Sequence, residues 1–263
     1  MEKVKIAIYS YRLDDKNLPF VEELFQKLVE KKVEVFIFKH FYQDLVGKIT
    51  FIQGLKTFET HDQLVGVDYL FSIGGDGTLL KTITFVRDKS IPILGINTGR
   101  LGFLTSIAIK EIDKAIEDVL AHNFDLDTRT LLSLETDEHL FGDINYALNE
   151  ITLQKKDTSS MITIQVYLGD EFLNSYWADG LIISTPTGST AYSLSCNGPI
   201  ILPGSGNIII NPIAPHNLNV RPVVVPDNSE LTLKIAGRTE NFLVALDSRS
   251  LTVPLSNEIK VKK

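Results

Sequence analysis

A glycine-rich turn in the first half of the chain has the residue types for phosphate chemistry. Gly74-Gly75-Asp76-Gly77-Thr78 follows the apolar run Tyr69–Ile73 and precedes a predicted helix over Leu79–Arg87. Glycines between a strand and a helix let the backbone approach a phosphate, and the helix N-terminus adds free amides and a favourable dipole. The turn is not a Walker A loop, because no G-K-[ST] follows, and Leu80 replaces the third glycine of a dinucleotide fingerprint.

Asp76 is the unexpected residue of this turn, because a carboxylate repels a bound phosphate. Two functions would justify it: accepting the proton of an attacking hydroxyl, or binding the metal ion of a nucleoside triphosphate. The structural alternative is an Asx-type turn in which Asp76 caps the helix. The two leading glycines, the trailing threonine and the strand-loop-helix setting favour the phosphate interpretation.

A second polar segment, Asn97–Leu104, follows the apolar run Ile91–Ile96. Ligands of doubly wound sheets collect at the carboxyl ends of the strands. This segment and Asp76 are therefore expected to face one crevice. Taken alone, the segment fits a plain glycine turn equally well.

The segment richest in hydrogen-bonding groups runs from Asp179 to Ser195. A buried-looking strand over Gly180–Thr185 enters a turn of small and hydroxyl-bearing residues, on which a planar ligand can lie close to the backbone. Tyr192 can line a base, and Asp179 with Asn149-Glu150 can accept hydrogen bonds from ribose hydroxyls or an exocyclic amine. The structural alternative is a Ser/Thr-rich connection with helix caps.

Other chemistries have no support in the sequence. The five histidines are scattered, no H-E-x-x-H occurs, and the single cysteine excludes a Cys-His zinc set. The sequence also contains no G-x-S-x-G elbow and no protein-kinase H-R-D or D-F-G set. No metal site made by the protein alone is predicted.

The elements that must position these segments change character along the chain. Up to residue 124, short apolar runs alternate with helical periodicity, which predicts a Rossmann-like parallel sheet covered by helices on both faces. Beyond it, short β-rich stretches are punctuated by eight of the ten prolines, all after residue 180, which predicts an all-β, sandwich-like unit. We therefore predict two domains, 1–124 and 125–263.

Composition limits the class of protein and its partners. The 263 residues are 44% hydrophobic and carry a formal net charge of −7, so the chain can bury a core and lacks the basic surface of a nucleic-acid binder. No signal-peptide pattern and no apolar run of the roughly 18–20 residues that span a bilayer occur. The lone Cys196 fits a reducing compartment. We expect a soluble cytoplasmic protein.

Taken in order, these segments make the chain similar to the NAD kinases, which phosphorylate NAD to NADP with ATP. The G-G-D-G-T turn is shared with diacylglycerol kinase-like and phosphofructokinase-like proteins. The full set is specific: Gly74–Thr78, Asn97–Phe103, Asn149-Glu150, and Asp179 with Thr185–Ser195. The later Pro212–His216 run, with Arg221-Pro222 following it, also resembles the family, so the resemblance covers nearly the whole chain.

The resemblance implies an α/β domain carrying the glycine turn, a β-rich NAD-binding domain, and Asp76 as the catalytic carboxylate. Trp177 departs from the family at a position where many relatives carry a basic side chain, and Arg249 stands where glutamine is common. The candidate substrate-binding residues are Gly75, Gly77, Thr78, Lys81, Phe103, Asn149, Glu150, Asp179, Thr187, Thr190, Ala191, Tyr192, Ser193, Leu194, Ser195, Ala214 and Arg249.

The implied reaction moves the γ-phosphoryl group of ATP to the 2′-hydroxyl of the adenosine ribose of NAD. A divalent cation, Mg²⁺ carried by ATP, would neutralise the triphosphate. The family also implies a homodimer or homotetramer. Two other functions compete: a lipid kinase explains Asp76 but not the Thr185–Ser195 turn, and a non-catalytic NAD(P) sensor explains the pocket but not Asp76.

Overall fold

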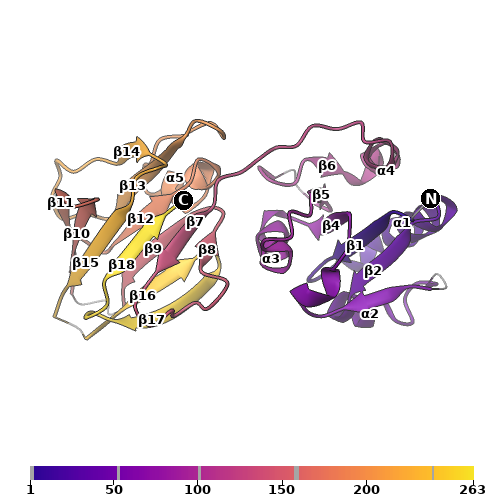
Figure 1. The fold of residues 1–263 in the computed structure, drawn as a ribbon, viewed down its shortest axis with the longest axis horizontal. Helices are drawn as coiled ribbons and strands as arrows, with labels where there is room; N and C mark the ends of the chain where they lie inside the picture. The colour runs from indigo at the N-terminus through magenta and orange to yellow at the C-terminus, as the bar shows by residue number, and fades with distance from the viewer. Residues whose placement is uncertain (1–2, 52–53, 100–101, 157–159, 239) are drawn as a thin grey trace. The chain divides into compact units, whose positions relative to one another are not determined.

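The computed structural model describes residues 3–51, 54–99, 102–156, 160–238 and 240–263. The chain divides into two compact units, Met1–Leu126 and Asp127–Lys263 (Figure 1). The sequence analysis predicts the boundary between the two domains between residues 124 and 125. Each unit is described by itself.

The first unit is built on a parallel six-stranded sheet in the order β3-β2-β1-β4-β5-β6, which confirms the predicted doubly wound architecture. The strands are β1 (Lys5–Tyr9), β2 (Glu34–Phe38), β3 (Lys56–Phe58), β4 (Tyr69–Gly74), β5 (Ile93–Asn97) and β6 (Ile107–Ala108). The helices are α1 (Leu18–Glu30), α2 (Lys39–Leu45), α3 (Asp76–Val86) and α4 (Ile112–Leu120), with short 3₁₀ turns at Asp15–Asn17, His61–Leu64 and Ile109–Glu111.

Buried strands and amphipathic helices form the core of this unit. All six residues of β4 are buried, as expected for a central parallel strand with both faces covered. Helix α1 buries Val21, Leu24 and Leu28, which recur at helical spacing. The strand order reverses between β1 and β4, so this sheet has its topological switch point at their carboxyl ends.

The second unit contains two antiparallel six-stranded sheets, in the orders β11-β10-β15-β18-β7-β8 and β14-β13-β12-β9-β16-β17. This confirms the predicted β-rich fold. The strands are β7 (Leu132–Glu135), β8 (Tyr146–Ala147), β9 (Glu150–Lys155), β10 (Ile162–Leu168), β11 (Glu171–Ala178), β12 (Gly180–Ser184), β13 (Asn207–Ile213), β14 (Val223–Pro226), β15 (Leu231–Ala236), β16 (Asn241–Leu246), β17 (Arg249–Pro254) and β18 (Ile259–Lys262).

One hydrophobic core joins the two sheets of the second unit, with Ile164 and Leu233 from the first sheet and Leu153 and Leu181 from the second. The helical content that the structure describes here is a 3₁₀ turn at Thr187–Thr190 and the one-turn α5 (Tyr192–Ser195). Inward and outward residues alternate along β16, the pattern of a strand with one buried face.

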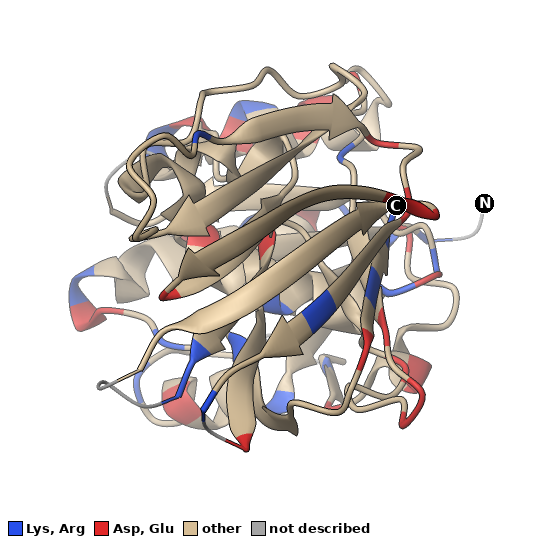
Figure 2. Cartoon of the chain, turned by 90° about the vertical axis from the view of Figure 1, so that its left-hand side faces the viewer, with Lys and Arg blue, Asp and Glu red and all other residues tan. Residues whose placement is uncertain are grey.

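Charged residues of both signs occur along the second unit. On the strands facing the viewer in Figure 2, Lys or Arg positions (blue) and Asp or Glu positions (red) are interspersed among uncharged ones. Among the described residues, no helix combines the length and the apolar character needed to cross a bilayer.

Candidate active site

The glycine turn joins β4 to α3 at the switch point of the parallel sheet. Gly75 is the N-cap of α3, and Asp76 is its first residue. A Cβ on Gly74, whose φ is +152°, would lie 2.3 Å from Thr78 Oγ1, so only glycine allows the chain to pass this close to the helix. Gly75 and Gly77 have open space around their Cα atoms. The turn therefore packs closely against α3 at Gly74 and leaves open space at Gly75 and Gly77.

Asp76 binds the backbone of the segment that follows β5. Its Oδ2 accepts a hydrogen bond from the Phe103 N–H at 2.8 Å. Its Oδ1 accepts three, from the Leu104 N–H at 3.1 Å and from the N–H and Oγ1 of Thr105, each at 3.0 Å. Charge-assisted bonds of this kind are stronger than neutral ones. Asp76 therefore fixes the Phe103–Thr105 segment at the edge where the glycine turn lies.

The two oxygens of Asp76 differ in what they can still accept. Oδ1 already accepts three hydrogen bonds, whereas Oδ2 accepts one and retains a lone pair for a further donor. Gly102 makes this arrangement possible, because a Cβ there would lie 2.1 Å from Oδ1. Sequence reasoning singled out Asp76 and Phe103 but missed Thr105. Arg100 and Leu101 of the same motif lie outside the described residues.

Lys81, one of the candidate residues, lies one helical turn beyond the glycine turn. Its Nζ is 3.4 Å from the ring centroid of Tyr11, an exposed residue that follows β1. Ser10, between β1 and Tyr11, is fully buried and its hydroxyl has no hydrogen-bond partner. The chain after β1 and the helix after β4 therefore meet at the switch point.

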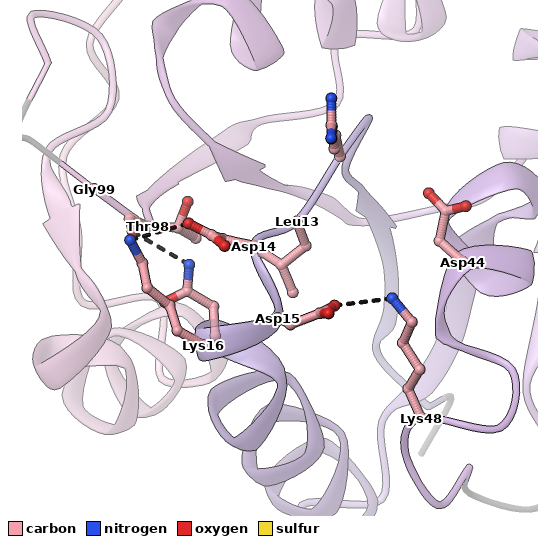
Figure 3. Close-up of a pocket in the computed structure, with 10 residues that line it drawn as sticks. Leu13, Asp14, Asp15, Lys16, Asp44, Lys48, Thr98 and Gly99 are labelled. Carbon is pink, nitrogen blue, oxygen red and sulfur yellow. Dashed lines mark hydrogen bonds and ion pairs between the residues drawn. The ribbon is translucent and has the colours of Figure 1, made fainter.

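A cavity of about 780 Å³ lies beside this edge of the first unit (Figure 3). Its basic and acidic groups are matched: Lys16 pairs with Asp14 at 3.0 Å, and Lys48 with Asp15 at 2.8 Å. A balanced cavity offers a polyphosphate little net attraction. The residues that line it are Arg12, Leu13, Asp14, Asp15, Lys16, Asn17, Asp44, Lys48, Thr98 and Gly99, and none belongs to the glycine turn.

In the second unit, Asn149 and Glu150 are held by a residue that sequence reasoning missed. The Asp247 carboxylate accepts hydrogen bonds from the N–H groups of Leu148 at 2.9 Å, Asn149 at 2.8 Å and Glu150 at 3.2 Å. In return, the Asp247 N–H donates to the Glu150 carbonyl at 3.1 Å. Asp247 is itself in the left-handed region, with φ +51°. This four-bond link fixes the backbone beneath both candidate side chains.

The Glu150 carboxyl group is in an unusual electrostatic environment. Burial and then the nearby Asp247 carboxylate raise the pKa of Glu150 to about 7, against the lowering effect of a hydrogen bond from the Tyr192 backbone. Burial also raises the pKa of Asp247, against the lowering effect of its three backbone donors and of Arg249. One Glu150 oxygen, Oε2, is buried without a partner. A buried acceptor without a donor is the feature expected where a ligand hydroxyl completes the bonding.

The raised pKa of Glu150 predicts a pH-dependent stability. The folded protein keeps the proton up to about pH 7, whereas the unfolded chain releases it near the ordinary glutamate pKa of 4.5. Between these values the folded state binds more protons, so its unfolding free energy falls as pH rises, by at most about 3 kcal/mol. Melting curves of the wild type and of Glu150→Gln across this window will measure the effect. We expect the wild type to lose several degrees relative to the variant, and parallel pH profiles would contradict the assignment.

Most hydroxyls of the turn after β12 hold the turn itself. Thr185 Oγ1 donates to the Leu148 carbonyl at 2.6 Å and accepts from the Gly188 N–H at 3.0 Å. Ser189 Oγ donates to the Pro186 carbonyl at 2.6 Å. Gly188 lies so close to Asn149 that a Cβ there would be 2.0 Å from the Asn149 carbonyl oxygen. These contacts pack the turn against Leu148–Glu150, the segment whose N–H groups donate to Asp247.

The remaining candidates of the turn divide into two groups. Thr190 Oγ1 donates to the Thr187 carbonyl at 3.3 Å, and Ser193 Oγ accepts from the side chain of buried Asn211 at 3.1 Å, so these hydroxyls are engaged within the unit. Tyr192, Leu194 and Ser195 are exposed, with 38% of the Tyr192 surface accessible. Ala191, between the groups, is half-buried. The surface offered to a ligand is therefore backbone with the Tyr192 ring, the Leu194 side chain and the Ser195 side chain.

Asp179 lies where β11 passes into β12. Its carboxylate forms an ion pair with Lys155 at 2.6 Å, and its N–H donates to the Ile213 carbonyl at 3.0 Å. Ala214, the candidate residue after Ile213, is exposed and has φ +42°. Asp179 and Tyr192 are close enough to interact, since Asp179 contributes to raising the pKa of the Tyr192 hydroxyl after burial and Cys196. The structure thus brings Glu150, Asp179 and Tyr192 together.

Arg249 has a role within the second unit. Its two terminal nitrogens donate to the carbonyls of Ile144 and Tyr146, and the guanidinium lies 5.9 Å from the Tyr146 ring centroid. Burial lowers the pKa of Arg249, against the raising effect of Asp247. These contacts fix the strand that leads to Asn149.

Comparisons with known proteins identify the family. The model described as "ATP-NAD kinase N-terminal domain" matches residues 6–124, and "ATP-NAD kinase C-terminal domain" matches residues 148–263. The chain belongs to the ATP-NAD kinase family. An NAD kinase from Cytophaga hutchinsonii is 47% identical over 258 residues, covering 98% of this chain and 88% of the relative.

Solved structures of an NADH kinase and an NAD kinase have the same fold. Yeast NADH kinase complexed with NADH has a TM-score of 0.88 at 25% identity, covering 99% of this chain and 78% of that one. An NAD kinase from Archaeoglobus fulgidus in complex with ATP has a TM-score of 0.74 at 24% identity, covering 100% and 90%. The predicted NAD kinase resemblance and fold are confirmed, and the lipid-kinase and sensor alternatives are not favoured.

Proposed function

We propose that this chain transfers the γ-phosphoryl group of ATP to the 2′-hydroxyl of the adenosine ribose of NAD, giving NADP and ADP. Two features carry the proposal, one in each unit. A glycine turn with an acidic residue lies at the switch point of the first unit. A partnerless buried carboxylate oxygen on Glu150 lies beside Tyr192 in the second.

In this mechanism the 2′-oxygen attacks the γ-phosphorus, and the bond from that phosphorus to the bridging oxygen of ADP breaks. The substrate proton passes to Asp76 Oδ2, the oxygen that retains a free lone pair. The open faces of Gly75 and Gly77 leave room for phosphate oxygens beside the N-terminal amides of α3. Glu150 and Asn149 would bind ribose hydroxyls or base edges of NAD.

A divalent cation, Mg²⁺, is proposed to arrive with ATP. In the part of the chain that the structure describes, no group of three His, Cys, Asp or Glu side chains could hold a metal ion. Mg²⁺ commonly binds through substrate phosphates and only one or two carboxylates, which fits this donor set. When bound it neutralises charge on the triphosphate. The chain's own contribution is to hold the phosphates at the glycine turn and to position the acceptor hydroxyl.

A coupled assay tests the function directly. Purified protein with NAD, ATP and Mg²⁺ should form NADP, and a reaction without ATP should form none. Binding of NAD without any NADP formation would favour a sensor, and phosphorylation of diacylglycerol instead of NAD would favour a lipid kinase.

Substitutions of Tyr192 test whether the turn after β12 forms part of a ligand pocket or only connects two strands. Base-aromatic stacking measured in single-stranded nucleic-acid binders is worth roughly 1–3 kcal/mol, so Tyr192→Ala should raise the NAD dissociation constant about tenfold or more. Tyr192→Phe should keep most of the affinity, because the ring face remains. Calorimetric titration of both variants with NAD measures the affinity, and their melting curves measure the stability. A Tyr192→Ala protein that melts early yet binds NAD normally when folded would remove Tyr192 from the site.

Two further parts of the proposal concern assembly and location. The family resemblance implies a homodimer or homotetramer, which light scattering measures. We expect a cytoplasmic location, supported by the single cysteine, Cys196, which allows no disulfide within the chain.

A further inference from the structure

Lys81 carries a positive charge without a counter-ion close to the glycine turn of the first unit. Its side chain is half-buried, and no Asp or Glu in the part of the chain that the structure describes is paired with it. The partner of its ammonium group is the ring of Tyr11, whose centroid lies 3.4 Å from Nζ. A partly desolvated cation that rests only on an aromatic face is still able to bind an anion.

Helix α3 places Lys81 on the same side as the open part of the glycine turn. Lys81 follows Gly77 by four residues, so the two lie on one face of the helix. Helical side chains lean toward the helix N-terminus, which directs the ammonium group back toward the turn. Gly77 is exposed, and a Cβ there would have no atom within 4 Å. The positive charge is therefore next to open space at the turn.

The pairing of β1 with β4 brings Tyr11 to this place. Tyr9 is opposite Ser72 in the parallel register, and continuing that register by two residues puts Tyr11 level with Gly74, where the glycine turn begins. The Lys81 ammonium is well within the roughly 6 Å of a cation–π contact with the Tyr11 ring. This contact holds the flexible lysine stem in place before any ligand binds.

Asp76 and Lys81 contact segments on opposite sides of the glycine turn. The sheet order places β4 between β1 and β5. Asp76 binds the Phe103–Thr105 segment, which follows β5, whereas Lys81 contacts Tyr11, which follows β1. A phosphoryl group at the turn would have a carboxylate on one side and an ammonium group on the other. This division suits phosphoryl transfer, because the attacking and leaving oxygens lie roughly in line on opposite sides of the phosphorus.

We propose that Lys81, held by Tyr11, binds the β- and γ-phosphate oxygens of ATP and stabilises the charge that develops on the leaving ADP. This inference rests on the proposed function and adds to it a catalytic residue, Lys81, and a positioning residue, Tyr11. The 2′-oxygen bonds to the γ-phosphorus, the bond from that phosphorus to the bridging oxygen breaks, and its electron pair stays on ADP. The substrate proton passes to Asp76, and Lys81 exchanges no proton in the step.

Lys81→Met and Lys81→Arg separate the charge of Lys81 from its stem. Met keeps an apolar stem on the Tyr11 ring without the charge, so kcat should fall about 10²-fold, as when one preorganised electrostatic contact is removed. Arg keeps the charge and should retain kcat to within about tenfold. The measurement is kcat at saturating NAD, ATP and Mg²⁺. Lys114→Met, at an exposed position of α4, is the matched control and should behave as wild type. Equal kcat values for Lys81→Met and Lys81→Arg would overturn the proposal.

Ligand binding gives a readout that needs no turnover. Calorimetric titration with ATP and Mg²⁺, in the absence of NAD, should show an affinity about tenfold weaker for Lys81→Met than for the wild type, because a charge-assisted contact is lost. The affinity for NAD should be the same in both proteins. An unchanged affinity for ATP, or an equal loss of affinity for NAD, would assign Lys81 a structural role instead.

A double-mutant cycle tests the positioning role of Tyr11. Tyr11→Phe keeps the ring face and should keep kcat, whereas Tyr11→Leu should lower kcat about three- to tenfold. Because Tyr11 acts through Lys81, Tyr11→Leu should have no further effect in a Lys81→Met protein. Losses that add in full would show that Tyr11 does not act through Lys81.

Failure of this inference can be told apart from failure of the proposed function. A wild-type protein that forms no NADP from NAD and ATP would refute the proposed function. An active wild type whose Lys81→Met variant keeps the wild-type kcat and affinity for ATP would refute this inference alone. Melting curves check that each variant is folded, and Lys81→Gln replaces Lys81→Met in the comparison if the Met variant folds poorly.

Discussion

Asp76→Asn is expected to lower kcat for NADP formation by about 10²–10⁴-fold, the usual contribution of a general base. The asparagine cannot take the substrate proton. Its NH₂ group would also face one or more of the N–H donors of residues 103–105 that Asp76 now binds. The measurement is kcat under saturating NAD, ATP and Mg²⁺. Asp88→Asn, an exposed acidic residue just beyond α3, controls for the loss of charge.

A second variant separates the chemical role of Asp76 from its anchoring role. Gly102→Ala keeps the carboxyl group in the protein, but its Cβ would lie 2.1 Å from Asp76 Oδ1, so it breaks the contact between that carboxylate and the Phe103–Thr105 segment. We expect Asp76→Asn to be far less active than Gly102→Ala. Equal losses of kcat in both variants would indicate that Asp76 acts by anchoring the Phe103–Thr105 segment. An Asp76→Asn enzyme with a kcat within a few-fold of wild type would leave Asp76 only a helix-capping role.

Asp247→Asn is expected to lower both the stability of the second unit and its binding of NAD. The carboxylate accepts three backbone N–H bonds, and bonds to a charged group are each worth about 1.5–3 kcal/mol, although they are not additive. Replacing one oxygen by an NH₂ group opposes donors with a donor. We expect at least about 3 kcal/mol of lost unfolding free energy and a KM for NAD raised about tenfold or more.

Denaturant unfolding and steady-state kinetics will measure both effects. Asp170→Asn, in the exposed turn between β10 and β11, removes the same charge and should change neither quantity. An Asp247→Asn enzyme with wild-type KM for NAD would show that the Leu148–Glu150 segment keeps its geometry without the carboxylate. A loss of stability with unchanged KM would separate folding from substrate binding.

Local patterns in the sequence were sufficient for the fold class and the central strands of the first unit, but not for its edge strands β3 and β6. Continuous apolar runs predicted β1, β4 and β5 to within a few residues, because a strand covered on both faces consists mostly of apolar residues. The glycine turn was recognisable because its backbone geometry tolerates few other residues, as the contact of Gly74 with Thr78 shows. The sequence also predicted that the chain after residue 124 is β-rich.

Sequence patterns were less informative about strands that pair with partners far away in the sequence. Residues 146–155 contain two strands, β8 and β9, in different sheets, with Leu148 and Asn149 between them. β18 pairs with β7, from the opposite end of this unit. Such partners are selected by the packing of a whole sheet, which no local periodicity encodes.

The residue types of the candidate site were evident in the sequence, because phosphate and nucleotide chemistry restricts them. Their working roles were decided by tertiary contacts. Asp247 is 98 residues from Asn149 in the chain, and only folding brings its carboxylate to that backbone. The hydroxyls of the Thr185–Ser193 turn are mostly engaged in holding it, as their bonding partners show. Trp177 meets His216 only because β12 pairs with β13, since a side chain's function depends on neighbours that the linear sequence does not name.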